Sequence, residues 1–77
     1  MINWKLKIES NPDIMYGKPV IKNTRIPVDL ILEKLAEGET VEDLLKAYPN
    51  IDRDAISSSL AFAADFIKNE IVYPIAS

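Results

Sequence analysis

Residues 17–35 read GKPVIKNTRIPVDLILEKL, and this stretch decides how the chain is organised. A short apolar segment at residues 20–21 is followed by the polar sequence KNTR at residues 22–25, and an amphipathic pattern begins directly after Pro27. Proline suits the first position of a helix because its ring fixes φ and its missing N–H needs no partner there. The stretch therefore predicts a short extended segment, a sharp polar corner and the start of a helix.

Two amphipathic helices are predicted directly after this corner. The first begins at Val28, where apolar residues recur at helical spacing, and it ends near Gly38. The second is opened by Thr40, with Asp43 three residues later as a short-armed capping box. This second helix must stop before Pro49, because the residue ahead of a proline disfavours helical angles.

A third, longer helix follows, with Asp52 as its expected N-cap. The turn over residues 48–52 is short enough for a helix-turn-helix. On a helical wheel the apolar stripe consists of Ala55, Ile56, Leu60, Phe62, Ala63, Phe66 and Ile67. The opposite, exposed face is expected to hold Arg53, Asp54, Ser57, Ser58, Ala61, Ala64, Asp65 and Lys68.

A small β element is predicted ahead of the helices. Residues 4–9 alternate apolar and charged side chains, which is the period of a half-buried strand. Two strands alone are marginally stable, so this element must pack on the helices or on a second subunit. We therefore expect one domain, with a β element and loop over residues 1–25, a trihelical part over 26–69 and an apolar tail over 70–77.

Composition excludes several classes of site. The chain has 77 residues, 48% of them hydrophobic and 27% charged, as in an ordinary globular domain. Without cysteine or histidine it has no disulfide, no thiolate metal site and no imidazole base. We expect no cofactor, no metal, no signal peptide and no membrane span, and hence a cytoplasmic protein.

The net charge of −3 is unevenly distributed. Residues 1–25 carry five basic and two acidic side chains, whereas residues 26–77 carry four basic and ten acidic ones. A polyanion would therefore be attracted to the N-terminal third of the chain.

The motifs GKPVI at residues 17–21, TRIPV at 24–28, LAEG at 35–38 and YP at 48–49 resemble the bacterial family called domain of unknown function 433. The resemblance implies a mainly α, homeodomain-like three-helix bundle with a helix-turn-helix and a small N-terminal β element. Members are similar to VapB-type antitoxins, and some are encoded beside PIN-domain ribonuclease toxins. Where the family has glycine before Thr-Arg, this chain has Asn23, which also tolerates a left-handed backbone.

Candidate DNA contacts lie at the corner and on the third helix. The corner offers two cations and a hydroxyl, while the exposed helix face offers an arginine and small side chains that fit a groove. These candidates are Lys22, Thr24, Arg25, Arg53, Ser57 and Ser58. Each has a structural alternative: Arg25 can pair with Asp29, Thr24 can bond the local backbone, and a face of small residues suits helix packing equally well.

Two functions of different class follow. One is a homodimeric antitoxin that binds operator DNA and neutralises a ribonuclease toxin, and the other is a protein-interaction module without DNA binding. Family resemblance favours the first, and the scarcity of cations favours the second. An enzyme is the weakest interpretation, because the acidic residues occupy turns and caps and the serines have no base to activate them.

Overall fold

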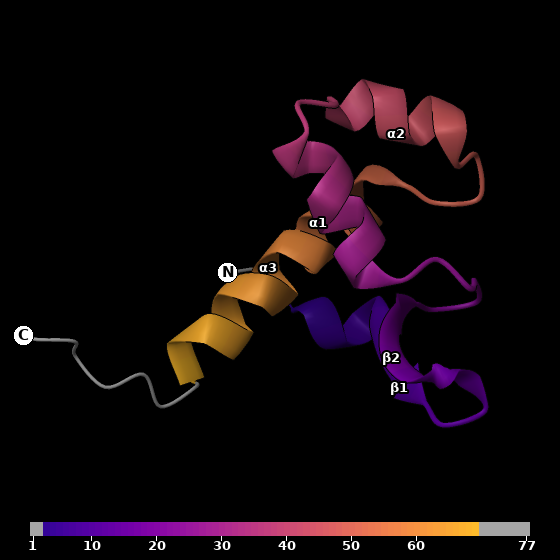
Figure 1. Ribbon diagram of the computed structural model, residues 1–77, viewed down its shortest axis with the longest axis vertical. Helices are drawn as coiled ribbons and strands as arrows, with labels where there is room; N and C mark the ends of the chain where they lie inside the picture. The colour runs from indigo at the N-terminus through magenta and orange to yellow at the C-terminus, as the bar shows by residue number, and fades with distance from the viewer. Residues whose placement is uncertain (1–2, 70–77) are drawn as a thin grey trace, which may run out of the picture.

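The computed structural model describes residues 3–69, which form a short 3₁₀ turn, a β-hairpin and three helices (Figure 1). The bounds are η1 Trp4–Leu6, β1 Ile8–Asn11, β2 Ile14–Ile21, α1 Val28–Ala36, α2 Val41–Ala47 and α3 Arg53–Asn69. Figure 1 shows the hairpin at one end of the molecule and α2 at the other, with α1 and the start of α3 between them.

The fold is α+β, and the prediction of a mainly α, homeodomain-like three-helix bundle was wrong. The hairpin is a structural part of the domain, because Ile8 of β1 and Val20 and Ile21 of β2 are all buried in the core. The predicted order, with a β element first and three helices after it, agrees with the structure.

Residues 4–6 were predicted as strand but form η1. The Asn3 side chain accepts a hydrogen bond from the Lys5 N–H at 3.1 Å and caps this turn. The turn directs the ring of Trp4 onto Phe62 of α3, edge to face, with ring centroids 4.8 Å apart. Packing of one aromatic side chain across the fold therefore overrides the local alternation, and the strand begins only at Ile8.

The hairpin contains a long irregularity in β2. Asn11 pairs with Ile14 and Ser10 pairs with Pro19, so residues 15–18 have no partner on β1. Met15, Tyr16 and Gly17 all have positive φ angles, of 51°, 57° and 84°. These angles loop the chain outward, and the Tyr16 side chain is fully exposed.

The helix ends follow the sequence signals closely. Pro27 is the N-cap of α1, and Gly38 leaves the helix with φ of 99°. At the start of α2 the predicted capping box is confirmed: the Thr40 N–H donates to Asp43 at 2.9 Å, and the Asp43 N–H donates to Thr40 Oγ1 at 3.1 Å. Asp52 Oδ1 accepts a hydrogen bond from the Ala55 N–H at 2.9 Å, as its predicted capping role requires.

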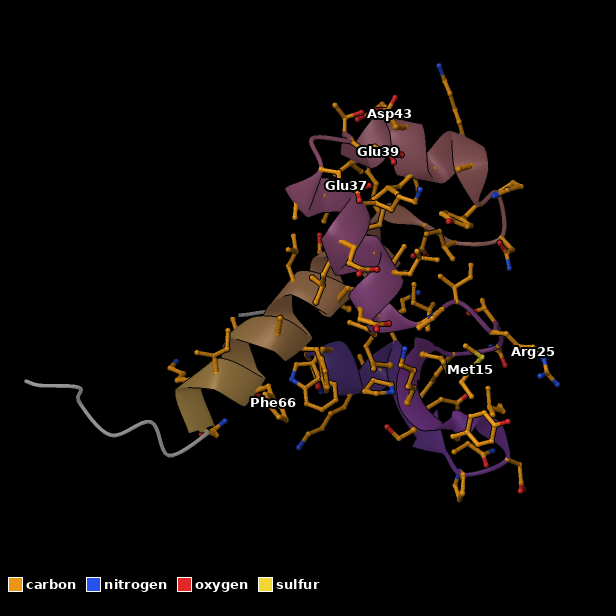
Figure 2. The ribbon with its side chains drawn as sticks, in the orientation of Figure 1. Met15, Arg25, Glu37, Glu39, Asp43 and Phe66 are labelled. Atoms are coloured by element: carbon orange, nitrogen blue, oxygen red, sulfur yellow. The ribbon has the colours of Figure 1, made fainter. Side chains whose placement is uncertain are left out.

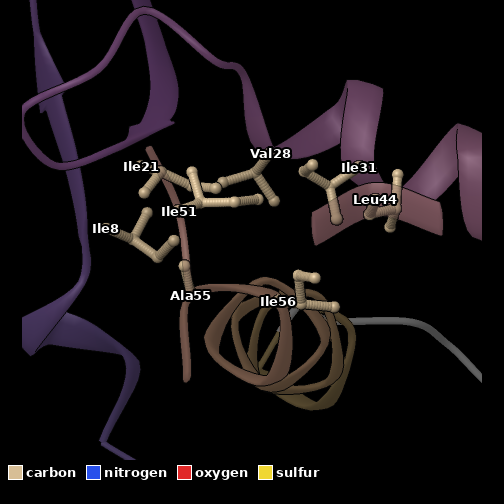
Figure 3. Packing of buried hydrophobic residues seen from close by; sticks show 8 residues of the cluster. All are labelled: Ile8, Ile21, Val28, Ile31, Leu44, Ile51, Ala55 and Ile56. Atoms are coloured by element: carbon tan, nitrogen blue, oxygen red, sulfur yellow. The ribbon is translucent and has the colours of Figure 1, made fainter. Parts of the chain in front are cut away.

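A single apolar cluster joins the hairpin to all three helices (Figure 3). Its members are Ile8, Ile21, Val28, Ile31, Leu44, Ile51, Ala55 and Ile56. Burial of a side chain such as Ile31 contributes about 1.5–3 kcal/mol, so this cluster is the main source of stability. It lies against the first half of α3. From the second half Phe62 packs against its edge, whereas Phe66 and Ile67 stay exposed.

The helical wheel predicted for α3 was therefore wrong at several positions on each face, although Ala55 and Ile56 are buried and Arg53 is exposed as predicted. Ser58, placed on the exposed face, is completely buried, while Leu60 and Ile67, placed in the apolar stripe, are 49% and 66% exposed. The first half of α3 is surrounded on several sides, and the second half projects from the domain, as Figure 1 shows. The apolar tail predicted over residues 70–77 lies outside the described residues.

Candidate interaction surfaces

The corner between β2 and α1 has the left-handed residue that the sequence predicted. Asn23 has φ of 64°. Thr24 Oγ1 donates to the carbonyl of Ile21 at 2.7 Å and accepts from the Ile26 N–H at 3.0 Å. The Thr24 hydroxyl therefore forms hydrogen bonds with the local backbone, and these bonds fix the geometry of the corner.

The two cations of the corner are exposed. Arg25 projects away from the rest of the domain (Figure 2). The alternative pairing of Arg25 with Asp29 is not formed, because Asp29 Oδ2 lies 2.9 Å from Lys18 Nζ. Within residues 3–69, neither Lys22 nor Arg25 forms an ion pair.

At the start of α3, the three candidate DNA contacts differ in charge and accessibility. Arg53 forms an ion pair with Glu42 of α2, which cancels its charge, and Ser57 is exposed. Ser58 is buried, and its Oγ makes no hydrogen bond to the described residues. Of the three positions predicted here for DNA contact, one is neutralised, one is accessible and one points into the fold.

A hollow of about 430 Å³ separates the corner from the start of α3. Lys22 and Asp52 both line it, and Asp52 Oδ2 lies 3.1 Å from Lys7 Nζ. The hydrogen bond from the Ala55 N–H, followed by the bond from Lys7, lowers the pKa of Asp52 below its usual value of 3.8. Asp52 therefore stays ionised at neutral pH, and the hollow is not a uniformly positive surface for phosphate.

A second surface lies where η1 meets the C-terminal half of α3. We call it the aromatic groove; it has a volume of about 330 Å³ and is lined by Trp4, Phe62, Asp65, Phe66 and Asn69. The four helix residues occur at i, i+3, i+4 and i+7, so they share one face of α3. That spacing was readable in the sequence, but Trp4 was assigned to a strand and the groove was missed.

The groove is held in shape by its own polar contacts. Trp4 Nε1 donates to Asp65 Oδ2 at 2.9 Å, and Asn69 Nδ2 donates to Asp65 Oδ1 at 3.0 Å. Phe62 packs between the rings of Trp4 and Phe66, with the two phenyl centroids 6.2 Å apart. Phe66 nevertheless remains 60% exposed, so the groove offers an aromatic face to a ligand (Figure 2).

Residues 3–69 contain neither a membrane-spanning helix nor a cluster of metal ligands. No helix in this part of the chain is long and apolar enough to cross a bilayer. Nor does this part contain a group of three or more acidic, histidine or cysteine side chains arranged to hold a metal ion.

Comparison with known proteins gives the family. A family model described as a protein of unknown function (DUF433) matches residues 8–63. The chain belongs to the DUF433 family. This DUF433 chain is 38% identical over 56 residues to the uncharacterized protein y4eO of Sinorhizobium fredii. It also resembles the crystal structure of a DUF433 member from Anabaena variabilis, with a TM-score of 0.72 and 27% identity.

These matches cover only part of each relative, which limits what they show about this chain. The alignment with y4eO covers 73% of this chain but 25% of that protein, and the Anabaena match covers 82% of this chain and 59% of that one. This DUF433 chain thus spans about a quarter of the curated relative. The description of the Anabaena protein gives the family, that of y4eO gives no function, and neither names an antitoxin. The matches therefore support DUF433 membership and not the VapB-type subgroup.

Proposed function

We propose that this DUF433 chain is a protein-interaction module whose aromatic groove binds an apolar side chain of a protein partner. The observation that carries the proposal is the 60% exposure of Phe66 beside the ordered pair of Trp4 and Phe62. Aromatic side chains are enriched at the centres of protein interfaces, where they fill or form pockets.

The groove is suited to binding because it is already formed. The hydrogen bonds of Asp65 with Trp4 and Asn69 hold its walls before any partner arrives. A preorganised surface loses little side-chain freedom on association, so more of the contact energy is retained as affinity.

Neutralisation of a PIN-domain ribonuclease toxin is the specific role that we propose for such a module. An enzyme that binds RNA presents cations to the phosphate backbone. The surplus of six acidic side chains in residues 26–77 complements a surface of that kind and speeds association with it.

The proposal is tested by co-expression of this chain with the PIN-domain ribonucleases encoded in the same genome. We expect one of these ribonucleases to purify together with this chain and growth to be restored. Phe66→Glu, which places a charge in the groove, should abolish both effects. Ala47→Glu is the matched control, because Ala47 is exposed on α2, far along the chain from the groove. Equal co-purification of wild type and Phe66→Glu would refute the groove as the binding site.

Binding of operator DNA is the second candidate, and it is favoured by Lys22 and Arg25, which are exposed and form no ion pair within residues 3–69. With few phosphates to neutralise, we expect weak affinity and a shallow salt dependence, with a log–log slope on the order of −3 to −6 for a dimer. Titration of the promoter fragment upstream of the gene, at several salt concentrations, tests this candidate. Equal affinity for that fragment and for random DNA would rule out operator recognition.

A further inference from the structure

The C-terminal half of α3 has a second apolar face, separate from the aromatic groove. At 100° per residue, Leu60, Ala63, Ala64 and Ile67 lie on one side of the helix, roughly opposite Phe62 and Asn69. We call these four residues the alanine strip. Leu60 and Ile67, at its two ends, are 49% and 66% exposed, and Ala64 between them is exposed as well.

The spacing of the strip is symmetric: a large side chain, two alanines and a large side chain. A two-fold axis placed between Ala63 and Ala64 brings Leu60 of one antiparallel helix onto Ile67 of the other and sets alanine against alanine at the centre. Such self-complementarity is what an isologous interface demands. Alanine at the centre lets the two helices approach closely, and their antiparallel macrodipoles attract.

We propose that the alanine strip binds a second copy of this chain, with the two α3 helices antiparallel. Residues 55–64 contain no charged side chain, so pairing brings no like charges together at the axis. Asp65, the nearest acid, faces the aromatic groove and is bonded to Trp4.

The sequence after Asn69 favours the same occupant. The eight residues that follow include four large apolar ones, Ile71, Val72, Tyr73 and Ile75, so the sequence at this end of the strip suits an apolar partner such as a second copy of the chain. The strip itself is small beside the roughly 800 Å² per partner of a standard interface, so we expect a dissociation constant in the tens of micromolar.

Sedimentation velocity from about 5 µM to about 500 µM tests the dimer across the range in which a weak interface dissociates. We expect wild type to shift from monomer to dimer. Ala64→Glu should raise the dissociation constant at least about tenfold, because two carboxylates then meet at the axis. Ala47→Glu, the same change on exposed α2, should leave it unchanged.

A mixing experiment distinguishes symmetry from simple damage. Ala64→Glu and Ala64→Lys should each be monomeric alone and should associate when combined, because the axis places the two substituted positions beside each other. A monomeric wild type at the highest concentration, or mixed variants that remain monomeric, would overturn the proposal. Phe66→Glu leaves the strip intact and should still dimerise, so loss of groove binding and loss of the dimer are separable.

Discussion

The two halves of α3 both contain apolar residues but have very different surroundings. In residues 53–61 even two serines are buried, whereas in residues 62–69 a phenylalanine and an isoleucine are mostly exposed. Both halves belong to one continuous helix. The difference lies in what surrounds each half. The first half passes between the hairpin, α1 and α2, and the second extends past them and is contacted by η1 (Figure 1).

This contrast separates two uses of apolar residues. Those that meet the core hold the fold together, and those that project from it form surfaces. A large exposed apolar patch on a small domain typically marks a site of interaction. The aromatic groove and the alanine strip take all their α3 residues except Leu60 from the projecting half, so we place binding mainly there and stability in the other half.

The largest expected effect comes from truncation of matched isoleucines in the two halves. Ile56→Ala should lower the free energy of unfolding by about 2–5 kcal/mol, since Ile56 is 1% exposed and a cavity remains. Ile67→Ala should change it by less than about 0.5 kcal/mol in the monomer. Urea unfolding followed by circular dichroism, at micromolar protein, measures both values. Equal losses would show that the projecting half is part of the core.

A smaller effect is expected at the cap of the buried half. Asp52→Ala should cost about 1 kcal/mol at pH 7, because the Ala55 N–H loses the carboxylate acceptor at 2.9 Å and keeps only the Asp52 carbonyl at 3.1 Å. In the folded state the pKa of Asp52 is lowered by the Ala55 N–H first and by Lys7 second. The unfolded state therefore binds the proton more readily, and the stabilising contribution is lost as the pH falls below about 4.

Urea midpoints at pH 7 and pH 3 for wild type and Asp52→Ala test this linkage. The difference between the two proteins should shrink in acid. Asp43, whose pKa is lowered mainly by the Thr40 N–H, adds a similar slope to both proteins and cancels in the comparison. A difference that is constant with pH would show that the carboxylate charge of Asp52 does not matter.

The smallest effect, with opposite sign, is expected at Ser58. Its buried Oγ has no hydrogen-bond partner among the described residues, so Ser58→Ala removes an unsatisfied polar group. We expect unfolding stability to be unchanged or raised by up to about 1 kcal/mol. Ser59→Ala is the control. Ser59 Oγ donates to the carbonyl of Ala55 at 3.0 Å, so this variant should lose unfolding stability. A loss at Ser58 equal to that at Ser59 would reveal an additional partner.

Local signals in the sequence predicted local structure well. The capping box of Thr40 and Asp43, the left-handed angle at Asn23 and the exit at Gly38 all depend on neighbours within a few residues. Such interactions are set by residue type and spacing, so a single sequence is enough to read them.

Long-range packing could not be predicted from the sequence in the same way. Trp4 contacts Phe62 and Asp65, which lie about 60 positions away, and no local pattern indicates that partnership. The burial of Ser58 and the exposure of Ile67 likewise depend on where the rest of the fold ends along α3. The helix was predicted from its periodicity, whereas its burial is set by elements distant in the sequence.

Trp4 gives the molecule a built-in optical reporter. It is the only tryptophan in the chain, and its indole touches both Phe62 and Asp65 inside the groove. Its emission spectrum therefore senses the water and charge around that one surface, without any attached dye. Acrylamide quenching of the Trp4 fluorescence therefore measures whether the groove is occupied. During unfolding, comparison of the Trp4 fluorescence with the far-ultraviolet ellipticity shows whether α3 detaches from η1 before the core unfolds.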